Sequence, residues 1–298
     1  MASTERWIVT GATGFVGGRL ATLAPGAVVP LSLAPDDWRS RMASLDYRSA
    51  TVVHLAARVH AYGGDEFAWT RDNVEKTAEL ARAAAAGGAR RFVFLSTIKV
   101  NGEETRDQPF RATDEPRPED AYARSKWAAE RELAAIARAS GLEYTVVRSP
   151  LVIGSAAPAN LAALVHLADS PWPLPFASIG NRRTFIARDD LVSLLARCAA
   201  SPRSPGRTFL AGDPDAVSTP RLFSVVRGAL ARAPRLFTLP AGLLEAAGSV
   251  LGQGGRMRRL TRSLEVDCRD VMETLDWAPG RAMDDALREM ALAAKGVD

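Results

Sequence analysis

A tyrosine and a lysine four residues apart, Tyr122 and Lys126, are the side chains in this sequence best suited to proton transfer. Residues 121–130 have a helical composition, and a spacing of four places both side chains on one helical face. A phenol is a poor acid or base near neutral pH because its pKa is about 10. A neighbouring ammonium group favours the phenolate and brings this pKa toward the working range. The pair therefore predicts acid–base chemistry in which Tyr122 exchanges the proton.

Three glycines with the spacing Gly-x-x-Gly-x-x-Gly follow the first apolar run of the chain, Trp7 to Val9, and precede a segment of helical composition, residues 19–24. Strand, glycine turn and helix together are the context of a dinucleotide site. The first glycine allows a tight turn, the second lets a pyrophosphate approach the backbone, and the third lets the helix pack closely. The residues expected to contact the dinucleotide here are Gly11, Thr13, Gly14, Phe15, Val16 and Gly17.

Apolar runs alternate with helical segments up to about residue 150, which predicts an α/β fold with a doubly wound parallel sheet of the Rossmann type. Ligands of such sheets bind beyond the carboxyl ends of the strands. From about residue 155 the pattern changes to loops and shorter helices with more proline. We therefore expect a dinucleotide-binding domain at 1–155, to which later segments can return. Residues 156–298 are expected to form mainly a smaller C-terminal substrate-binding lobe.

Composition excludes several classes of function. Lys and Arg number 38 against 34 Asp and Glu, without a dense basic run, so nucleic acid is not an expected partner. Cys198 and Cys268 lack ligand-like spacing, and we expect no metal site. With neither a signal peptide nor a membrane span visible, we expect a cytoplasmic protein. The apolar stretch 239–252 is too short to span a bilayer; a packed helix is expected there, and a homodimer or membrane-surface contact is left open.

These segments together resemble the extended short-chain dehydrogenase/reductase family, NAD-dependent epimerases and dehydratases that act on nucleotide sugars. The matching motifs lie in family order: the glycine turn, His-Leu-Ala-Ala at 54–57, Ser-Thr at 96–97, Tyr-x-x-x-Lys, and Leu-Asp-Trp-Ala-Pro at 275–279. The resemblance implies that Thr97 hydrogen-bonds the reacting oxygen and that Lys126 binds the nicotinamide ribose. It also implies a wider set of cofactor contacts, namely Leu55, Ala56, Ala57, Ser96, Tyr122 and Lys126.

A UDP-sugar is the substrate that the resemblance implies. Asn160 stands where family members direct an asparagine toward the nucleotide diphosphate, and Arg183 fits the arginine of an Arg-x-Phe/Tyr-Ile segment. A guanidinium group suits phosphate oxygens, and Arg259 in the basic cluster 256–262 is a further candidate for phosphate. The remaining candidate for substrate binding is Lys99.

The chain departs from the family at three neighbouring positions. Dehydratases carry an Asp-Glu pair directly after the catalytic Thr, and here Ile98 and Lys99 replace it, so elimination chemistry lacks its acid and base. Asn101 replaces a tyrosine and is expected to alter the sugar pocket. A dehydratase is therefore not expected.

The cofactor and the exact reaction stay open. The second apolar run ends without the acidic residue typical of NAD sites, because Asp36 and Asp37 come slightly late and Arg39 and Arg41 follow them; this slightly favours NADP over NAD. Residues 96–102 favour a reductase of UDP-4-keto-6-deoxy-N-acetylhexosamines in bacterial surface-polysaccharide assembly. The alternative is a UDP-hexose 4-epimerase with tightly held NAD. A non-catalytic dinucleotide sensor is disfavoured because Tyr122 and Lys126 are both present.

Overall fold

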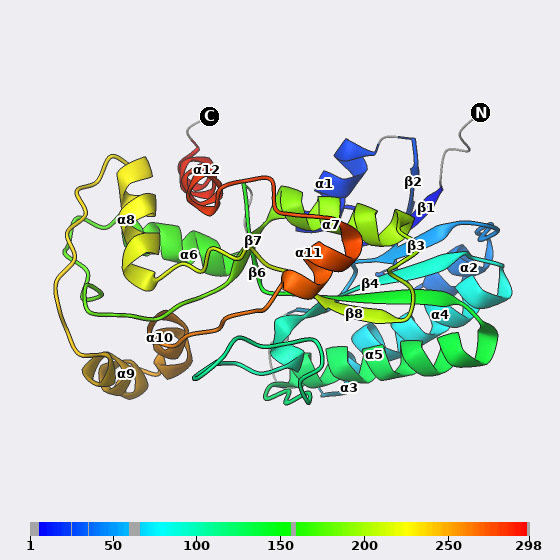
Figure 1. The fold of residues 1–298 in the computed structure, drawn as a ribbon, viewed down its shortest axis with the longest axis horizontal. Coiled ribbons are helices and arrows are strands. Elements are labelled where there is room, and N and C mark those ends of the chain that lie inside the picture. The colour runs from blue at the N-terminus through cyan, green and yellow to red at the C-terminus, as the bar shows by residue number, and fades with distance from the viewer. Residues whose placement is uncertain (1–5, 25, 35, 60–65, 156–158, 297–298) are drawn as a thin grey trace.

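The computed structural model describes residues 6–24, 26–34, 36–59, 66–155 and 159–296. Six strands of this described part form one parallel sheet in the order β2-β1-β3-β4-β5-β8 (Figure 1). They are β1 (Trp7–Thr10), β2 (Val28–Leu31), β3 (Thr51–His54), β4 (Arg91–Thr97), β5 (Glu143–Ser149) and β8 (Arg207–Leu210). The predicted Rossmann-type α/β fold is confirmed.

Helices cover both faces of this sheet, which explains why its central strands are apolar almost throughout. On one face Ile8, Phe92 and Leu133 belong to a single core cluster, and on the other Val9, Val93 and Leu195 do. The first face carries α2 (Trp38–Ala43), α4 (Lys76–Ala86) and α5 (Ala121–Ser140), and the second carries α1 (Phe15–Leu23), α7 (Arg188–Ala200) and α11 (Arg269–Leu275).

The strand order reverses at β1, which determines where a ligand can bind. Trp7 of β1 pairs with Val28 of β2 on one side and with Thr51 of β3 on the other. Crossovers leave in opposite directions from this point, and a crevice opens at the carboxyl ends of β1 and β3. Three short elements lie near this end of the sheet: α3 (Glu66–Trp69), the π-helical turn η1 (Thr70–Glu75) and the 3₁₀ turn η2 (Ile98–Val100).

A second core, which includes Phe176, Phe223 and Leu287, holds a smaller C-terminal lobe together. The lobe contains α6 (Ala159–Ala168), α8 (Thr219–Ala229), α9 (Ala241–Val250), α10 (Gly254–Thr261), α12 (Met283–Lys295) and the parallel pair β6 (Leu151–Ile153) and β7 (Phe185–Ala187) (Figure 1). The chain after residue 155 also returns to the large sheet through α7, β8 and α11. Among the described helices, none has the length and apolar character that crossing a membrane requires.

Candidate active site

The glycine turn joins β1 to α1 where the strand order reverses. Gly11 has a φ of +68°, and a Cβ at this position would lie 2.9 Å from the backbone nitrogen of Ala56. A Cβ at Gly17 would clash with the carbonyl oxygen of Gly11, so α1 packs directly on the turn. No side chain of the described residues caps the N-terminus of α1 at Gly14. The amide groups of this helix end are therefore available to a phosphate.

A cavity of about 540 Å³ opens beside the turn, along the ends of β1, β2 and β3. Of the predicted cofactor residues, Gly11, Thr13, Ala56 and Ala57 line it; the others, among them Tyr122 and Lys126, lie outside its wall. The described residues that line it are Gly11, Ala12, Thr13, Pro30, Leu31, Ser32, Leu33, Ala34, Ala56, Ala57, Arg58, Arg71, Asp72 and Lys76. Sequence reasoning missed the four charged residues at the end of this series. For Lys76, the sequence feature that could have indicated a role is the scarcity of lysine, since the chain has only four.

Three cations surround the single carboxylate of this cavity. Asp72 lies 2.6 Å from Arg58, 3.0 Å from Arg71 and 2.9 Å from Lys76. Burial alone would raise the pKa of Asp72, but the hydrogen bonds from these three cations outweigh it and hold the pKa well below its usual range. The cavity therefore keeps an excess of positive charge. Arg39 and Arg41, the arginines considered for this role from the sequence, instead pair with Glu79 and Asp37 and do not line the cavity.

Tyr122 and Lys126 project from the first two turns of α5, whose N-terminus is capped by Asp120, since the Asp120 carboxylate accepts a hydrogen bond of 2.6 Å from the backbone of Ala123. Lys126 Nζ lies 3.9 Å from the centroid of the Phe94 ring on β4. Burial raises the pKa of Tyr122 above its usual range, and the charge of Asp120 adds to this. Burial lowers the pKa of Lys126 to about 7, against the opposing effect of Glu130. Burial thus favours the neutral form of both groups, whereas the prediction from the sequence took into account only the effect of a positively charged Lys126 on the pKa of Tyr122.

The buried Lys126 predicts a pH dependence of stability. The Lys126 pKa is about 7 in the folded chain against 10.5 for a free lysine, so the unfolded chain binds more protons between these values. The contribution of Lys126 to the free energy of unfolding must then rise with pH through this window. Lys126→Met should remove that rise between about pH 7 and 9, below the range where unfolded tyrosines ionise. Urea unfolding of both proteins at several pH values measures the slope, and identical slopes would contradict the assignment.

The end of β4 brings the remaining predicted groups to the N-terminal end of α5. Ser96 Oγ donates inward to Glu130 on α5, whereas Thr97 Oγ1 accepts a hydrogen bond of 3.3 Å from the backbone of Lys99. Lys99 Nζ donates to Glu103 and Asp120, both at 2.6 Å. Lys99 is thus held between two carboxylates, one of which caps the helix that carries Tyr122.

A buried ion pair between α5 and β5 supports this arrangement. Glu130 and Arg148, each about 4% exposed, approach to 2.7 Å. Arg148 also donates to Asn101 Oδ1 at 2.9 Å, and the amide group of Asn101 donates to the carbonyl of Arg111 at 2.9 Å. Asn101, which was expected to alter the sugar pocket, is buried and links β5 to the loop that follows η2. Sequence reasoning singled out neither Glu130 nor Arg148, since nothing in their local sequence indicates that they meet.

The substrate residues predicted in the C-terminal lobe are only partly described. Arg183 is largely buried and donates to the carbonyl of Arg262 at 3.0 Å. Burial and the nearby charge of Arg259 lower the pKa of Arg183 to about 10, and Glu103 opposes this effect. Arg183 therefore lies within electrostatic reach of both Arg259 and the Glu103 that holds Lys99. Asn160 lies in the first turn of α6, and its side chain falls outside the described residues.

Comparison with known proteins agrees with this geometry. The model of the NAD dependent epimerase/dehydratase family matches residues 7–212. The UDP-glucose 4-epimerase of Vibrio cholerae is 33% identical, over 96% of this chain and 94% of that protein. The chain belongs to the NAD-dependent epimerase/dehydratase family.

Several solved structures have the same fold as this chain over nearly its whole length. The UDP-glucuronic acid 4-epimerase of Bacillus cereus in complex with NAD superimposes with a TM-score of 0.77 at 17% identity, over 98% of this chain and 99% of that chain. RMD of Pseudomonas aeruginosa complexed with NADPH has a TM-score of 0.75 at 19% identity, with the same coverage of both chains. The UDP-glucose 4-epimerase of Thermotoga maritima with UDP-glucose has a TM-score of 0.74 at 20% identity, again with this coverage.

As a member of this family, the chain is an enzyme that uses a nicotinamide dinucleotide, NAD or NADP. The residues present fit such a group, because the turn at Gly11 and Gly17 leaves no space for a Cβ and the cavity beside it carries an excess of positive charge. Asn73 of η1 donates to Ser125 Oγ at 2.9 Å and accepts from the backbone of Arg58 at 2.7 Å. It thereby joins α5 to the end of β3.

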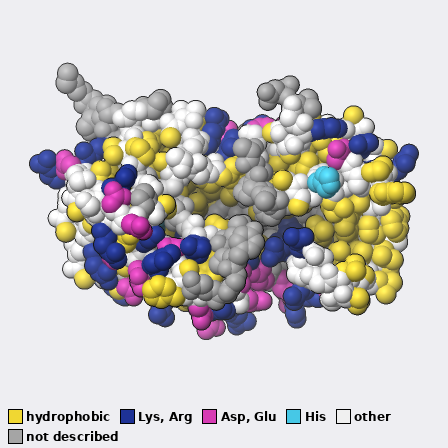
Figure 2. All heavy atoms as spheres, turned by 180° about the vertical axis from the view of Figure 1, so that it is seen from behind, with side chains coloured by type: hydrophobic (Ala, Val, Ile, Leu, Met, Phe, Trp, Pro, Cys, Tyr) yellow, Lys and Arg dark blue, Asp and Glu magenta, His cyan; other side chains and the backbone are white. Residues whose placement is uncertain are grey.

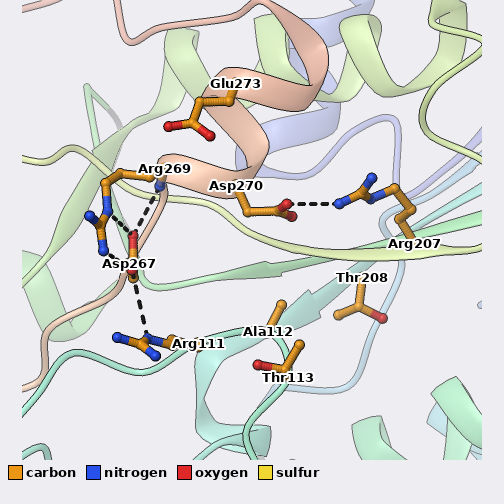
Figure 3. Close-up of a pocket in the computed structure, with 9 residues that line it drawn as sticks. All are labelled: Arg111, Ala112, Thr113, Arg207, Thr208, Asp267, Arg269, Asp270 and Glu273. Carbon is orange, nitrogen blue, oxygen red and sulfur yellow. Dashed lines mark hydrogen bonds and ion pairs between the residues drawn. The ribbon is translucent and has the colours of Figure 1, made fainter.

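A second cavity, also of about 540 Å³, lies between β8, α11 and the loop around Arg111 (Figure 3). Five of its six charged side chains pair with one another: Arg207 lies 2.7 Å from Asp270, and Asp267 lies 2.6 Å from Arg269 and 3.9 Å from Arg111. None of the predicted site residues lines this cavity. We therefore assign the active site to the crevice at β1 and β3.

Proposed function

We propose that the enzyme transfers hydride at C4 of a UDP-activated hexose and acts as a 4-epimerase. The observation that carries the proposal is the placement of Tyr122 and the buried Lys126 on one face of α5, with Lys126 against the strand β4 that ends at Thr97. This arrangement unites a proton-exchanging phenol with a hydroxyl that can hold the reacting oxygen. The relative from Vibrio cholerae, named a UDP-glucose 4-epimerase and matched over nearly its whole length, supports the epimerase outcome.

A bound nicotinamide dinucleotide supplies a hydride acceptor at this site and, in its reduced form, a hydride donor. As the phenolate, the form that the positive charge of a bound nicotinamide would favour against the effect of burial, Tyr122 would take the proton of the C4 hydroxyl as the C4 hydride passes to that hydride acceptor. It would return the proton when hydride comes back to the opposite face. Thr97 Oγ1 orients the oxygen through both steps, and Lys126 orients the nicotinamide ribose. Ile98 is buried and Lys99 is held by two carboxylates, so no acid–base pair is present for water elimination.

We assign the UDP diphosphate to Arg183 and Arg259, with Asn160 at the start of α6. Among the described residues, the partly buried guanidinium of Arg183 hydrogen-bonds the carbonyl of Arg262. The charges of Arg183 and Arg259 repel each other, an arrangement that an anion between them would stabilise. In this proposal residues 156–298 mainly form the sugar-nucleotide lobe, and the enzyme acts in the cytoplasm.

The second candidate is a 4-ketoreductase of UDP-4-keto-6-deoxy-N-acetylhexosamines in surface-polysaccharide biosynthesis. The charge of the cofactor cavity favours it: Arg58 and Lys76 outnumber Asp72, and the described residues at the end of β2 contribute no acid to the lining. Such a cavity suits the additional phosphate of NADPH, which a reductase must exchange at every turnover.

Two incubations separate the candidates. The purified enzyme is first given UDP-glucose without added cofactor, and the products are separated to detect a C4 epimer. It is then given a UDP-4-keto-6-deoxy-N-acetylhexosamine with NADPH or NADH, and oxidation is followed by absorbance. A C4 epimer without stoichiometric oxidation supports the epimerase; stoichiometric oxidation without the epimer replaces it with the reductase. No reaction in either incubation would contradict both substrate assignments.

A further inference from the structure

The C-terminal lobe carries a concentration of positive charge that the active site does not explain. Residues 216–262 contain eight arginines and one acidic residue, Glu245, although the whole chain has a net charge of only +4. The arginines are Arg221, Arg227, Arg232, Arg235, Arg256, Arg258, Arg259 and Arg262. Acids outside this range pair with three of them: Asp215 and Asp284 with Arg221, Asp169 with Arg232, and Glu104 with Arg262. Arg227 is buried and donates to the carbonyl of Ala233. The carboxylate of Glu245 forms an ion pair with Arg262 and accepts a hydrogen bond from Thr261 Oγ1, both at 2.7 Å. The nucleotide sugar accounts for Arg259, which leaves the exposed Arg256 and Arg258 of α10 without a role.

Large apolar side chains are exposed on the same lobe. α9 buries only Leu244 and Gly248, and the fully exposed positions along it carry no charge. Leu243 is 58% exposed, and Val250 and Leu251, at the end of α9, are 87% and 74% exposed. A hydrophobic side chain in water is unfavourable by roughly 25 cal/mol per Å² of exposed apolar surface. A helix end that carries two such side chains implies that something covers them.

Two exposed aromatic residues lie in segments that adjoin the beginning of α9. Trp172, 73% exposed, and Phe237 belong to neighbouring segments that are joined by hydrogen bonds between Leu174 and Arg235 and between Phe237 and Leu174. Figure 2 shows apolar side chains gathered over this end of the molecule. We call the set formed by Leu243, Val250, Leu251, Arg256 and Arg258 the α9–α10 face; Trp172 and Phe237 are exposed aromatic residues of the same lobe.

The arginines and the apolar tip belong to one rigid unit. A Cβ at Gly248 would lie 2.8 Å from the Met257 Cβ, so α9 and α10 are in close contact. The tip at Val250 and Leu251 lies at the turn between them, and Arg256 and Arg258 follow within two helical turns. An apolar tip with flanking arginines and an exposed tryptophan has the composition of segments that lie in the interface of a bilayer.

We propose that the α9–α10 face docks the enzyme on an anionic lipid bilayer. Val250 and Leu251 enter the boundary between headgroups and acyl chains, and Arg256 and Arg258 pair with lipid phosphates. A second copy of the chain fits this face less well, because a two-fold contact would bring Arg256 and Arg258 of both copies together, while Glu245 and Glu104 are already paired with Arg262. The proposal does not depend on which C4 reaction the enzyme performs.

Sedimentation with lipid vesicles tests the proposal. The full chain is mixed with vesicles of phosphatidylcholine, or of equimolar phosphatidylcholine and phosphatidylglycerol, and the bound fraction is measured at low and high salt. We expect binding to the anionic vesicles and its loss at high salt. Arg256→Gln/Arg258→Gln should weaken partitioning about tenfold or more, because each basic residue contributes to attraction by the anionic surface. Val250→Ser/Leu251→Ser should weaken it similarly by removing apolar contact.

Matched variants away from the face serve as controls. Leu23→Ser changes a leucine with 52% exposure at the end of α1, and Arg138→Gln/Arg203→Gln removes two exposed arginines from other surfaces. These controls should bind vesicles as the unmodified chain does, and all variants should keep its thermal midpoint and its turnover in solution. Absence of binding, equal binding to neutral vesicles, or equal losses in the controls would overturn the proposal. So would a lipid-free dimer that dissociates in Val250→Ser/Leu251→Ser, which would assign the face to a second copy.

Discussion

Replacing Tyr122 by phenylalanine should lower kcat by about 10²–10⁴-fold, because the proton-exchanging group is lost while the ring that packs 5.9 Å from Trp69 remains. Dinucleotide binding should change little, since the cavity that holds the cofactor lies against other residues. The measurement is kcat with the substrate that the two incubations identify, together with titration of NAD or NADPH by fluorescence. A loss in kcat without a loss in binding separates a chemical role from a structural one.

Tyr144→Phe is the matched control for this variant. Tyr144 lies on β5, and its contact with the remainder of the chain includes a backbone hydrogen bond from Gly206 that the substitution retains. The control should keep nearly full turnover. If Tyr122→Phe also kept full turnover, another group would exchange the proton and the assignment of Tyr122 would be wrong.

Arg148→Met should lower the free energy of unfolding by about 3–5 kcal/mol, because it leaves the carboxylate of Glu130 buried without its ionic partner. The same substitution removes the hydrogen bond to Asn101 and thereby frees the loop that follows η2. Chemical denaturation of the two proteins measures the difference. Arg138→Met, at an exposed position near the end of α5, should change stability only slightly.

A second variant distinguishes the ion pair from simple loss of packing. Glu130→Leu/Arg148→Met removes both charges and should recover part of the lost stability, since an apolar pair no longer requires compensation. Additive losses in the double variant would show that the two residues stabilise the fold independently. That result would contradict the coupling between the two residues that we infer from their 2.7 Å separation.

Local patterns in the sequence were sufficient to predict the class of the sheet, the glycine turn and the helical face that carries the candidate catalytic pair. The alternation of apolar runs and helical segments determined the class of the sheet, because each buried strand must be apolar on both faces. The spacing of Gly11, Gly14 and Gly17 determined the turn, since a Cβ at Gly17 would meet the carbonyl oxygen of Gly11. The interval between Tyr122 and Lys126 placed both on one helical face. Each of these inferences depends on neighbours within a few residues.

Only the tertiary structure decided which charges meet and how deeply they lie. Asp72 pairs with cations from two segments, Arg58 after β3 and Arg71 and Lys76 at η1. Glu130 of α5 pairs with Arg148 of β5. The pKa of Lys126 is lowered to about 7 by the burial that packing imposes, which its spacing from Tyr122 does not reveal. Electrostatic effects depend on distance in space and on exclusion of water, and both arise only when distant segments pack together.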